Sequence, residues 1–229
     1  REHAEILSQT DCFAEVRCAF LKEEPLIENA LDEVGEEQVI IVPDFLAEGY
    51  FTRQVVPAKL GDKLRSANIC CTPPVGTHPM MAEIINDMAR EVLGDWTVEQ
   101  TSLLVVGHGS GKNPCSKQSL LGHLQEVRNN TDFAQVADLW LEELPLVSSW
   151  KEVATQRHII VIPYLLNDGQ HGGWDIPAEL GLSLDQQIHG QTHDVESHQI
   201  RLTPALGTSP RFAEVISQLA EIWGQTSGE

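Results

Sequence analysis

The pattern of apolar and polar positions predicts short buried strands that alternate with helices. Residues 39–42 and 159–162 form continuous, β-branched runs that end at a proline. Such runs are typical of strands covered on both faces of a sheet. We expect a further apolar strand over residues 102–106. Two more are expected over residues 13–16 and 133–136, which share a Phe-Ala-x-Val pattern.

Helical patterns surround these strands. Two of the expected helices begin at Pro25 and Pro145, because proline is favoured in the first helical turn. The expected helices cover residues 2–9, 25–34, 81–93, 120–129, 145–154 and 212–223. Strands and helices that alternate in this way indicate α/β units with parallel sheets.

The same pattern occurs twice along the chain. An offset of 120 residues (133 − 13) places residues 13–16 on 133–136, and it holds without a gap to Leu60-Gly61 on Leu180-Gly181. Beyond this point Thr72-Pro73 matches Thr203-Pro204 at an offset of 131, so the second copy carries 11 additional residues within the region 182–198. We therefore expect two tandem domains from an internal duplication, over residues 1–97 and 98–229.

The two copies differ at their start. The second copy begins with the strand at 102–106 and a glycine-rich loop, and subtracting 120 places their counterparts before residue 1. We therefore expect the first copy to lack its first strand in this chain.

Composition limits the class of protein. The formal net charge of the 229 residues is −19, which argues against a nucleic-acid partner. No run is apolar enough for a membrane span, and the start Arg1-Glu2-His3 does not look like a signal peptide. The five cysteines form no CxxC pair, which favours reduced thiols. We expect a cytoplasmic protein.

The loop Gly107-His108-Gly109-Ser110 follows an apolar strand, at the sheet edge where parallel α/β folds bind ligands. A dinucleotide fingerprint is excluded because position 112 is Lys, and a P-loop is excluded because position 113 is Asn. A nucleophile elbow around Ser110 would need glycines at 108 and 112. What remains is a histidine held between two glycines, which either binds a ligand or only bonds the backbone.

A second histidine, His171, follows the strand at 159–162 and should lie at the same sheet edge as His108. Neutral imidazoles suit divalent ions such as Co²⁺, Fe²⁺ and Zn²⁺. Two histidines alone would leave coordination positions open, which suits transient delivery of a metal more than structural storage.

Three motifs together resemble the CbiX-type sirohydrochlorin chelatases. They are Gly-His-Gly-Ser at the strand end, an acidic residue in Trp140-Leu141-Glu142-Glu143, and Pro-x-Leu-Leu-x-x-Gly-x-His followed by Asp-Ile-Pro. The resemblance spans essentially the whole chain. It implies flavodoxin-like, three-layer αβα domains with parallel sheets, and ATP-independent insertion of a divalent metal into sirohydrochlorin.

The resemblance also implies roles for single residues. His108 would be a metal ligand and proton acceptor, His171 the second metal ligand, and Glu142 a catalytic carboxylate that relays protons or orients the ring. The implied substrate-binding residues of the second copy are Ser110, Leu166, Asn167, Asp168, Gly169 and Gln170.

The first copy departs from this pattern, because Phe51 stands where the second copy has His171 and Lys22 where it has Glu142. We expect it to form the opposite wall of one cleft. Glu48, Tyr50 and Arg53 would face the ring, and the cations that could meet substrate carboxylates are Lys22, Arg53 and Lys112.

Other polar and aromatic residues are open to two interpretations. His189, His193 and His198 lie in the 182–198 region with Asp185, Asp194 and Glu196, as a metal-collecting loop or as a solvated insertion. Trp174 is the best candidate for stacking on a ring.

The expected function is insertion of Co²⁺ or Fe²⁺ into sirohydrochlorin, in sirohaem or cobalamin biosynthesis. The metal would be a substrate, with no permanently bound cofactor, and the protein a monomer or weak homodimer. Two alternatives stay open: a non-catalytic carrier of metal or tetrapyrrole, and a zinc hydrolase on a similar fold.

Overall fold

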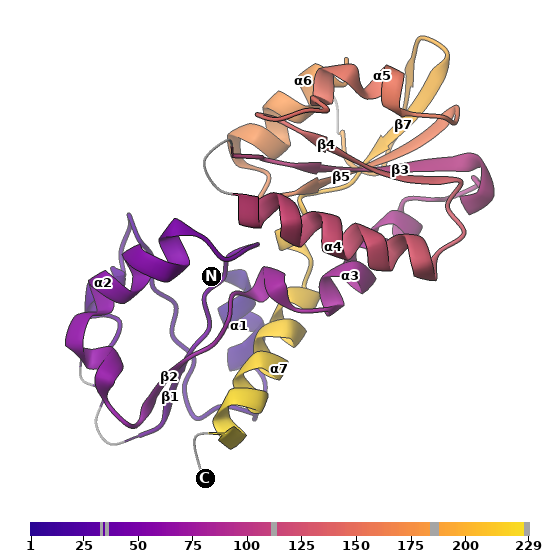
Figure 1. Cartoon of the computed structure of the whole chain (residues 1–229). Coiled ribbons are helices and arrows are strands. Elements are labelled where there is room, and N and C mark those ends of the chain that lie inside the picture. The colour runs from indigo at the N-terminus through magenta and orange to yellow at the C-terminus, as the bar shows by residue number, and fades with distance from the viewer. Residues whose placement is uncertain (33, 35–36, 111–113, 184–187, 227–229) are drawn as a thin grey trace. The chain divides into compact units, whose positions relative to one another are not determined.

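The structure is a computed structural model that describes residues 1–229 except 33, 35–36, 111–113, 184–187 and 227–229. The chain folds into two compact units (Figure 1). Unit 1 comprises Arg1–His78 and Pro210–Glu229, and unit 2 comprises Pro79–Ser209. In the described ranges, no helix is long and apolar enough to cross a membrane.

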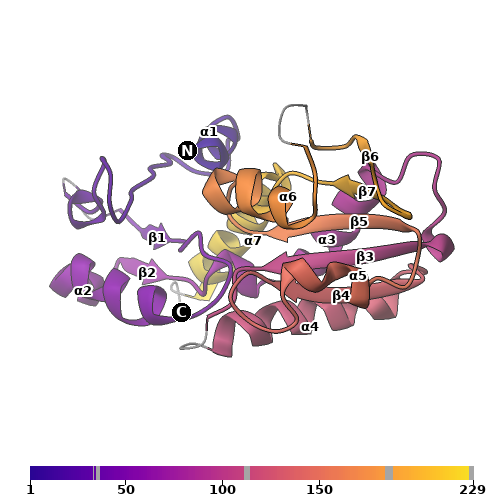
Figure 2. The same ribbon diagram turned by 90° about the horizontal axis from the view of Figure 1, so that it is seen from above.

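Unit 2 is built on a five-stranded sheet of order β4-β3-β5-β7-β6, with β4 and β6 at opposite edges (Figure 2). All neighbouring strands are parallel except β6 and β7, which form an antiparallel pair. The strands are β3 (Thr101–Gly107), β4 (Gln135–Trp140), β5 (His158–Tyr164), β6 (Thr192–Val195) and β7 (His198–Leu202).

Helices cover both faces of this sheet, with α3 and α4 on one side and α5 and α6 on the other (Figure 1). The α-helices are α3 (Met80–Glu91), α4 (Pro114–Asn130), α5 (Trp150–Val153) and α6 (Ile176–Glu179). Shorter helical segments are η5 (Val98–Gln100), η6 (Val147–Ser149), η7 (His171–Asp175) and η8 (Leu206–Thr208). Every residue of β3 is buried, as expected for a central strand between two helical layers. The three-layer α/β architecture is confirmed.

Unit 1 contains a parallel pair of strands, β1 (Val39–Ile41) and β2 (Ile69–Cys71). The α-helices of this unit are α1 (Glu2–Ser8), α2 (Val56–Leu60) and α7 (Arg211–Thr226). Shorter segments are η1 (Ile27–Asn29), η2 (Phe51–Val55), η3 (Gly61–Arg65) and η4 (Val75–Thr77). The residues of β1 are only partly buried, so the expectation of a strand buried on both faces fails here.

The strand expected at residues 13–16 does not form. Its counterpart in unit 2 leads into β4, which pairs with β3. In the described part of unit 1 no strand lies beside residues 13–16 to complete the backbone hydrogen bonds of a sheet. Only an isolated bridge between Phe20 and Leu26 remains.

The duplication is visible in the strand registers. In unit 1 Val39 pairs with Ile69, and in unit 2 Ile159 pairs with Ile200. The two pairs are equivalent, because their first residues differ by 159 − 39 = 120 and their second residues by 200 − 69 = 131, the two offsets found in the sequence. The additional residues of the second copy contribute β6, which adds an antiparallel edge beside β7.

The helices expected to begin at Pro25 and Pro145 are wrong in extent. The first is only a single 3₁₀ turn, Ile27–Asn29, and the second is the 3₁₀ turn Val147–Ser149 followed by α5. The prolines instead lie in bends whose backbone pairs with the preceding strand segment, because Pro145 accepts the N–H of Trp140 and Pro25 accepts that of Phe20. In each bend the proline carbonyl is therefore bonded to the preceding segment and does not accept a hydrogen bond within a helix.

The compact units do not coincide with the two sequence copies. Helix α3, from the first copy, packs on α4 in unit 2, while α7, from the second copy, packs on α1 and β1 in unit 1. Each helix buries its apolar face in the unit formed mainly by the other copy. The connection after α3 is held by Arg201 of β7, which donates to the carbonyls of Val92 and Leu93 and lies 3.8 Å from the ring centre of Trp96.

Candidate active site

Two histidines meet at the carboxyl edge of the sheet in unit 2. His108 follows β3 and His171 begins η7, after β5, the strand next to β3. Their ring centres are 4.8 Å apart and their planes are nearly perpendicular, at 86°. Both side chains are close to half exposed, at 42% and 48%. One ion with metal–nitrogen bonds of about 2.0–2.1 Å could contact both rings.

The turn that carries His108 depends on two glycines. A Cβ on Gly107 would lie 2.3 Å from the Trp140 ring, so a larger residue would not fit beside β4. Gly109 has a φ of +79°, in the left-handed region that favours glycine. The near side of the turn is tied to β4 because Glu142 donates its N–H to the carbonyl of His108 at 3.1 Å.

Hydrogen bonds select the same tautomer in both imidazoles. The Nδ1 of His108 lies 2.9 Å from the carbonyl oxygen of Gly109, and a carbonyl only accepts, so Nδ1 carries the proton. The Nδ1 of His171 lies 2.7 Å from Oδ2 of Asp175, which must likewise accept. Each ring therefore presents the lone pair of Nε2, the form that binds metals.

Asp175 is a site residue that belongs to the Asp-Ile-Pro part of the third motif, where the sequence assigned it no role. It lies four residues after His171 and also accepts a hydrogen bond from Gln170 at 3.1 Å. These bonds, first from Gln170 and then from His171, hold the pKa of Asp175 below its usual range. A carboxylate behind a ligand histidine fixes the ring and raises its basicity. The spacing of four residues was the available signal.

Glu142 lies beside His108, with its Oε2 3.9 Å from Nδ1. Its side chain is 60% exposed, so it can be reached from the open side of the histidine pair. Its catalytic role stays a prediction, and the position is compatible with it.

Glu143 points to the other side of the turn. One carboxylate oxygen accepts the backbone N–H of Ser110, and the other lies 3.3 Å from the ammonium group of Lys117. The Ser110 bond, followed by Lys117, lowers the pKa of Glu143 against the opposing effect of burial. The sequence pattern assigned Glu143 no role, because its contact with Ser110 joins the end of β4 to the turn after β3.

Asp168 is a structural tie in the loop that leads to His171. Its Oδ1 accepts the N–H of Ala205 at 2.8 Å, and its carbonyl accepts that of Gly173. In the first copy Pro74 stands where Ala205 stands, and proline has no N–H to donate. These bonds give Asp168 a structural role that requires no substrate. Its contact with the substrate stays a prediction.

The rest of this loop packs against the η8 turn. Gly207 donates to the carbonyl of Leu165 at 2.9 Å, and a Cβ on it would lie 2.4 Å from the carbonyl oxygen of Leu166. Asn167, Gly169 and Gln170 are exposed, whereas Leu166 is half-buried. Their substrate contacts, and that of Ser110, stay predictions. Lys112 lies outside the described residues.

Unit 1 has different chemistry at the position of His171. Phe51 stacks with Phe45 at 6.3 Å and meets the Tyr50 ring edge-on at 5.7 Å. Arg53 forms an ion pair with Glu48, so its charge already has a partner within the unit. Lys22 is exposed. The ring-facing roles predicted for Glu48, Tyr50 and Arg53 stay predictions.

The hairpin in the 182–198 region directs its polar groups to separate partners. His193 bonds the carbonyl of Ile188 at 3.0 Å, His198 packs edge-on against Trp150 at 5.2 Å, and Glu196 pairs with Lys151. The Nε2 of His189 lies 3.7 Å from Asp168. Within the described ranges no three of these side chain types converge on a metal position, and Asp185 lies outside those ranges. These contacts agree with the solvated insertion, and the metal-collecting loop stays an untested alternative.

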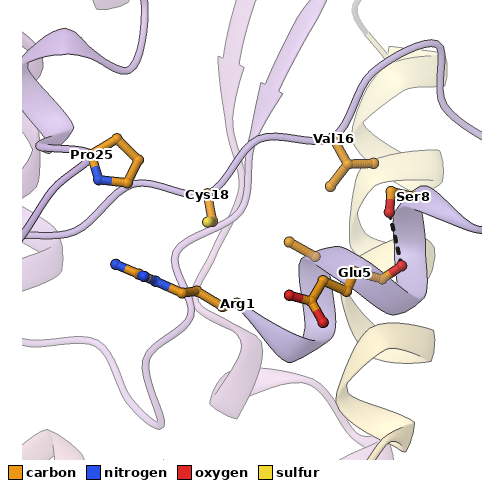
Figure 3. Close-up of a pocket in the computed structure, with 7 residues that line it drawn as sticks. Arg1, Glu5, Ser8, Val16, Cys18 and Pro25 are labelled. Carbon is orange, nitrogen blue, oxygen red and sulfur yellow. Dashed lines mark hydrogen bonds between the residues drawn. The ribbon is translucent and has the colours of Figure 1, made fainter.

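A hollow of about 310 Å³ lies in unit 1, between α1 and the segment around Val16 and Cys18 (Figure 3). Arg1, Glu5 and Ser8 of the α1 region form one side of it. Ala4 also lines it and stands where the second copy has the fully buried Leu124. The smaller side chain leaves space at this position, and no catalytic residue predicted from the sequence lines the hollow.

The fold and the paired histidines define a family. The chain belongs to the CbiX family, whose model matches residues 1–92 and 102–222. It is 31% identical over 253 aligned residues to the probable sirohydrochlorin cobaltochelatase of Halobacterium salinarum, covering 99% of this chain and 86% of that protein.

Solved structures share the fold. SirB from Bacillus subtilis with Fe³⁺ superposes with a TM-score of 0.76 at 19% identity, covering all of this chain and 91% of that one. A multi-domain Deinococcus radiodurans protein with structural similarity to chelatases gives a TM-score of 0.78 at 24% identity. The match covers 96% of this chain but only half of the Deinococcus protein.

Proposed function

We propose that this protein inserts a divalent metal, Co²⁺ or Fe²⁺, into sirohydrochlorin without a nucleotide. The observation that carries the proposal is the His108–His171 pair, in which both Nδ1 atoms are engaged and both Nε2 atoms are left to bind a metal. Membership of the CbiX family and the cobaltochelatase name of the Halobacterium relative support the same reaction.

The open site suits a metal that must be released. Two imidazoles hold the ion while its remaining positions are free for water and then for the nitrogens of the macrocycle. In the described residues no third His, Cys, Asp or Glu completes the set, as a three-ligand zinc hydrolase site would require. The donor set therefore favours delivery of the metal over hydrolysis.

Proton removal can follow metal transfer at the same atoms. As the ion moves to the ring nitrogens, Nε2 of His108 and Nε2 of His171 each have a lone pair free again, and each can accept one of the two pyrrole protons that the metal displaces. The carboxylate of Glu142, 3.9 Å from Nδ1, would stabilise the resulting imidazolium. The exposed indole of Trp174, three residues after His171, could stack on the ring.

The test is anaerobic incubation with sirohydrochlorin and Co²⁺ or Fe²⁺, followed by absorption spectroscopy. The protein should change the spectrum of the macrocycle well above the uncatalysed rate. His108→Ala should reduce that rate about 10²-fold or more, as loss of a catalytic base does. A carrier would give at most one modified macrocycle per chain, and equal rates with and without protein would refute the proposal.

A further inference from the structure

We propose that Glu143 is a positioning residue for the metal ligand His108, and that Lys117 holds Glu143 in place. The inference rests on the proposed function, because it concerns how that metal site is kept in shape. It assigns separate tasks to the two adjacent carboxylates at the end of β4.

The contacts of Glu143 link the His108 turn to helix α4. Its Oε1 accepts the N–H of Ser110, and its Oε2 lies 3.3 Å from Nζ of Lys117, a residue of α4. Lys117 also donates to the carbonyl of Leu144 at 3.1 Å and lies 5.0 Å from the ring centre of Trp140. These contacts hold the ammonium group of Lys117 in place, and Lys117 in turn holds the carboxylate of Glu143.

The bond to Ser110 is placed where the turn needs support. Backbone bonds from Leu141 and Glu142, directly after β4, tie the turn at Gly107 and His108, each at 3.1 Å. Glu143 adds a tie at Ser110, on the far side of the histidine. Glycine at position 109 permits this approach, because a Cβ there would lie only 3.1 Å from Cγ of Glu143. With both sides of the turn held, the ring of His108 keeps its position.

Glu142 and Glu143 differ in surroundings as well as in contacts. The Glu142 side chain is 60% exposed and lies near Nδ1 of His108, whereas that of Glu143 is 19% exposed and faces the backbone of the turn. A carboxylate with ordered partners on both oxygens is suited to hold geometry. The exposed carboxylate remains available to exchange protons.

The chain contains a matched control for Lys117. Lys151 also pairs with a glutamate, Glu196, and also lies over an indole, with Nζ 5.5 Å from the Trp150 ring centre. This second arrangement joins α5 to the β6–β7 hairpin and has no contact with the His108 turn in any of these bonds. Lys151→Met therefore removes the same chemistry without affecting the proposed tie.

The experiment compares Glu143→Ala, Glu143→Gln, Lys117→Met, Lys151→Met and His108→Ala. Co²⁺ affinity is measured from the visible absorption of the bound ion, together with kcat and KM for sirohydrochlorin. Glu143→Ala should weaken Co²⁺ binding about 10- to 100-fold, as loss of an outer ligand support does. The amide of Glu143→Gln still accepts the Ser110 N–H, so its loss should be only about three- to fivefold.

Lys117→Met should resemble Glu143→Gln, and Lys151→Met should match the unsubstituted protein. KM should stay within about twofold throughout, because the tie acts on the metal ligand and not on the macrocycle. If His108→Ala loses Co²⁺ while Glu143→Ala keeps it, the positioning role is wrong and the proposed function stands. If His108→Ala also keeps its affinity, the proposed function itself fails. Should Glu143→Ala not fold, wild-type Co²⁺ affinity of Glu143→Gln would overturn the inference.

Discussion

The imidazole of His171 donates its Nδ1 proton to the carboxylate of Asp175, with 2.7 Å between Nδ1 and Oδ2. The bond joins the first and last residues of η7. It keeps the proton on Nδ1 of His171 and leaves the lone pair on Nε2, in a ring whose centre is 4.8 Å from that of His108. Asp175 thereby sets the tautomer of the predicted metal ligand.

Asp175→Asn should weaken metal binding about 10- to 100-fold while leaving the fold intact, because the negative partner of the imidazole is lost. The measurement is a Co²⁺ titration followed by visible absorption. Asp194→Asn is the matched control, since Asp194 also accepts a glutamine side chain, Gln199, at 3.0 Å, but on the hairpin. Equal affinities for the two variants would contradict the role of Asp175.

Asp168 can be tested as a structural tie against a substrate contact. Asp168→Asn keeps an oxygen that accepts the N–H of Ala205, so stability and KM should both stay close to those of the unsubstituted protein. Asp168→Ala leaves that N–H without its acceptor and should lower the free energy of unfolding by about 1 kcal/mol, measured by urea denaturation. A severalfold rise in KM for Asp168→Asn would instead indicate direct contact with the substrate.

Gly107→Ala should destabilise the protein by about 1–3 kcal/mol, because a Cβ would be forced against the Trp140 ring. Displacement of the indole should also change the fluorescence of Trp140. Gly122→Ala serves as a control within α4, where a Cβ would meet nothing within 4 Å. It should be neutral or stabilise by up to about 1 kcal/mol. Equal melting temperatures for the two variants would contradict the close packing of Gly107.

The lowered pKa of Glu143 makes its contribution to stability depend on pH. The unfolded chain holds the proton of this carboxyl more tightly than the folded chain, so the contribution is present above the ordinary glutamate pKa of about 4.3 and is lost as the pH falls through the folded value. The melting temperature of Glu143→Gln should therefore be lower at pH 7, and the difference should shrink below about pH 4. A constant difference from pH 7 to pH 3 would contradict this.

Much of the architecture could be read from the chain because repetition exposes equivalent positions. The two offsets that align the copies map the pairing of Val39 with Ile69 onto that of Ile159 with Ile200. The apolar run in β3 indicated a central strand, and its glycine-flanked histidine indicated the site. His108 and His171 follow adjacent parallel strands, so their proximity was predictable.

Other features depend on contacts that sequence spacing does not reveal. Helix α3 of the first copy lies in unit 2, and α7 of the second copy lies in unit 1. The amphipathic pattern of each helix predicts that one face is buried, but it does not say in which unit. The segment at 13–16 has a strand pattern but pairs with no strand among the described residues. Pro25 and Pro145 resemble the first residues of helices, but they lie in bends. The hydrogen bond between Glu143 and Ser110 joins residues 33 positions apart.

We propose that the histidine pair of unit 2, His108 with His171, performs repeated metal insertion. The most direct measurement is the amount of metallated sirohydrochlorin formed per chain under anaerobic conditions with excess macrocycle and Co²⁺. We predict many products per chain for the unsubstituted protein and loss of turnover in both His108→Ala and His171→Ala. Product limited to one per chain, or undiminished turnover in either variant, would contradict it.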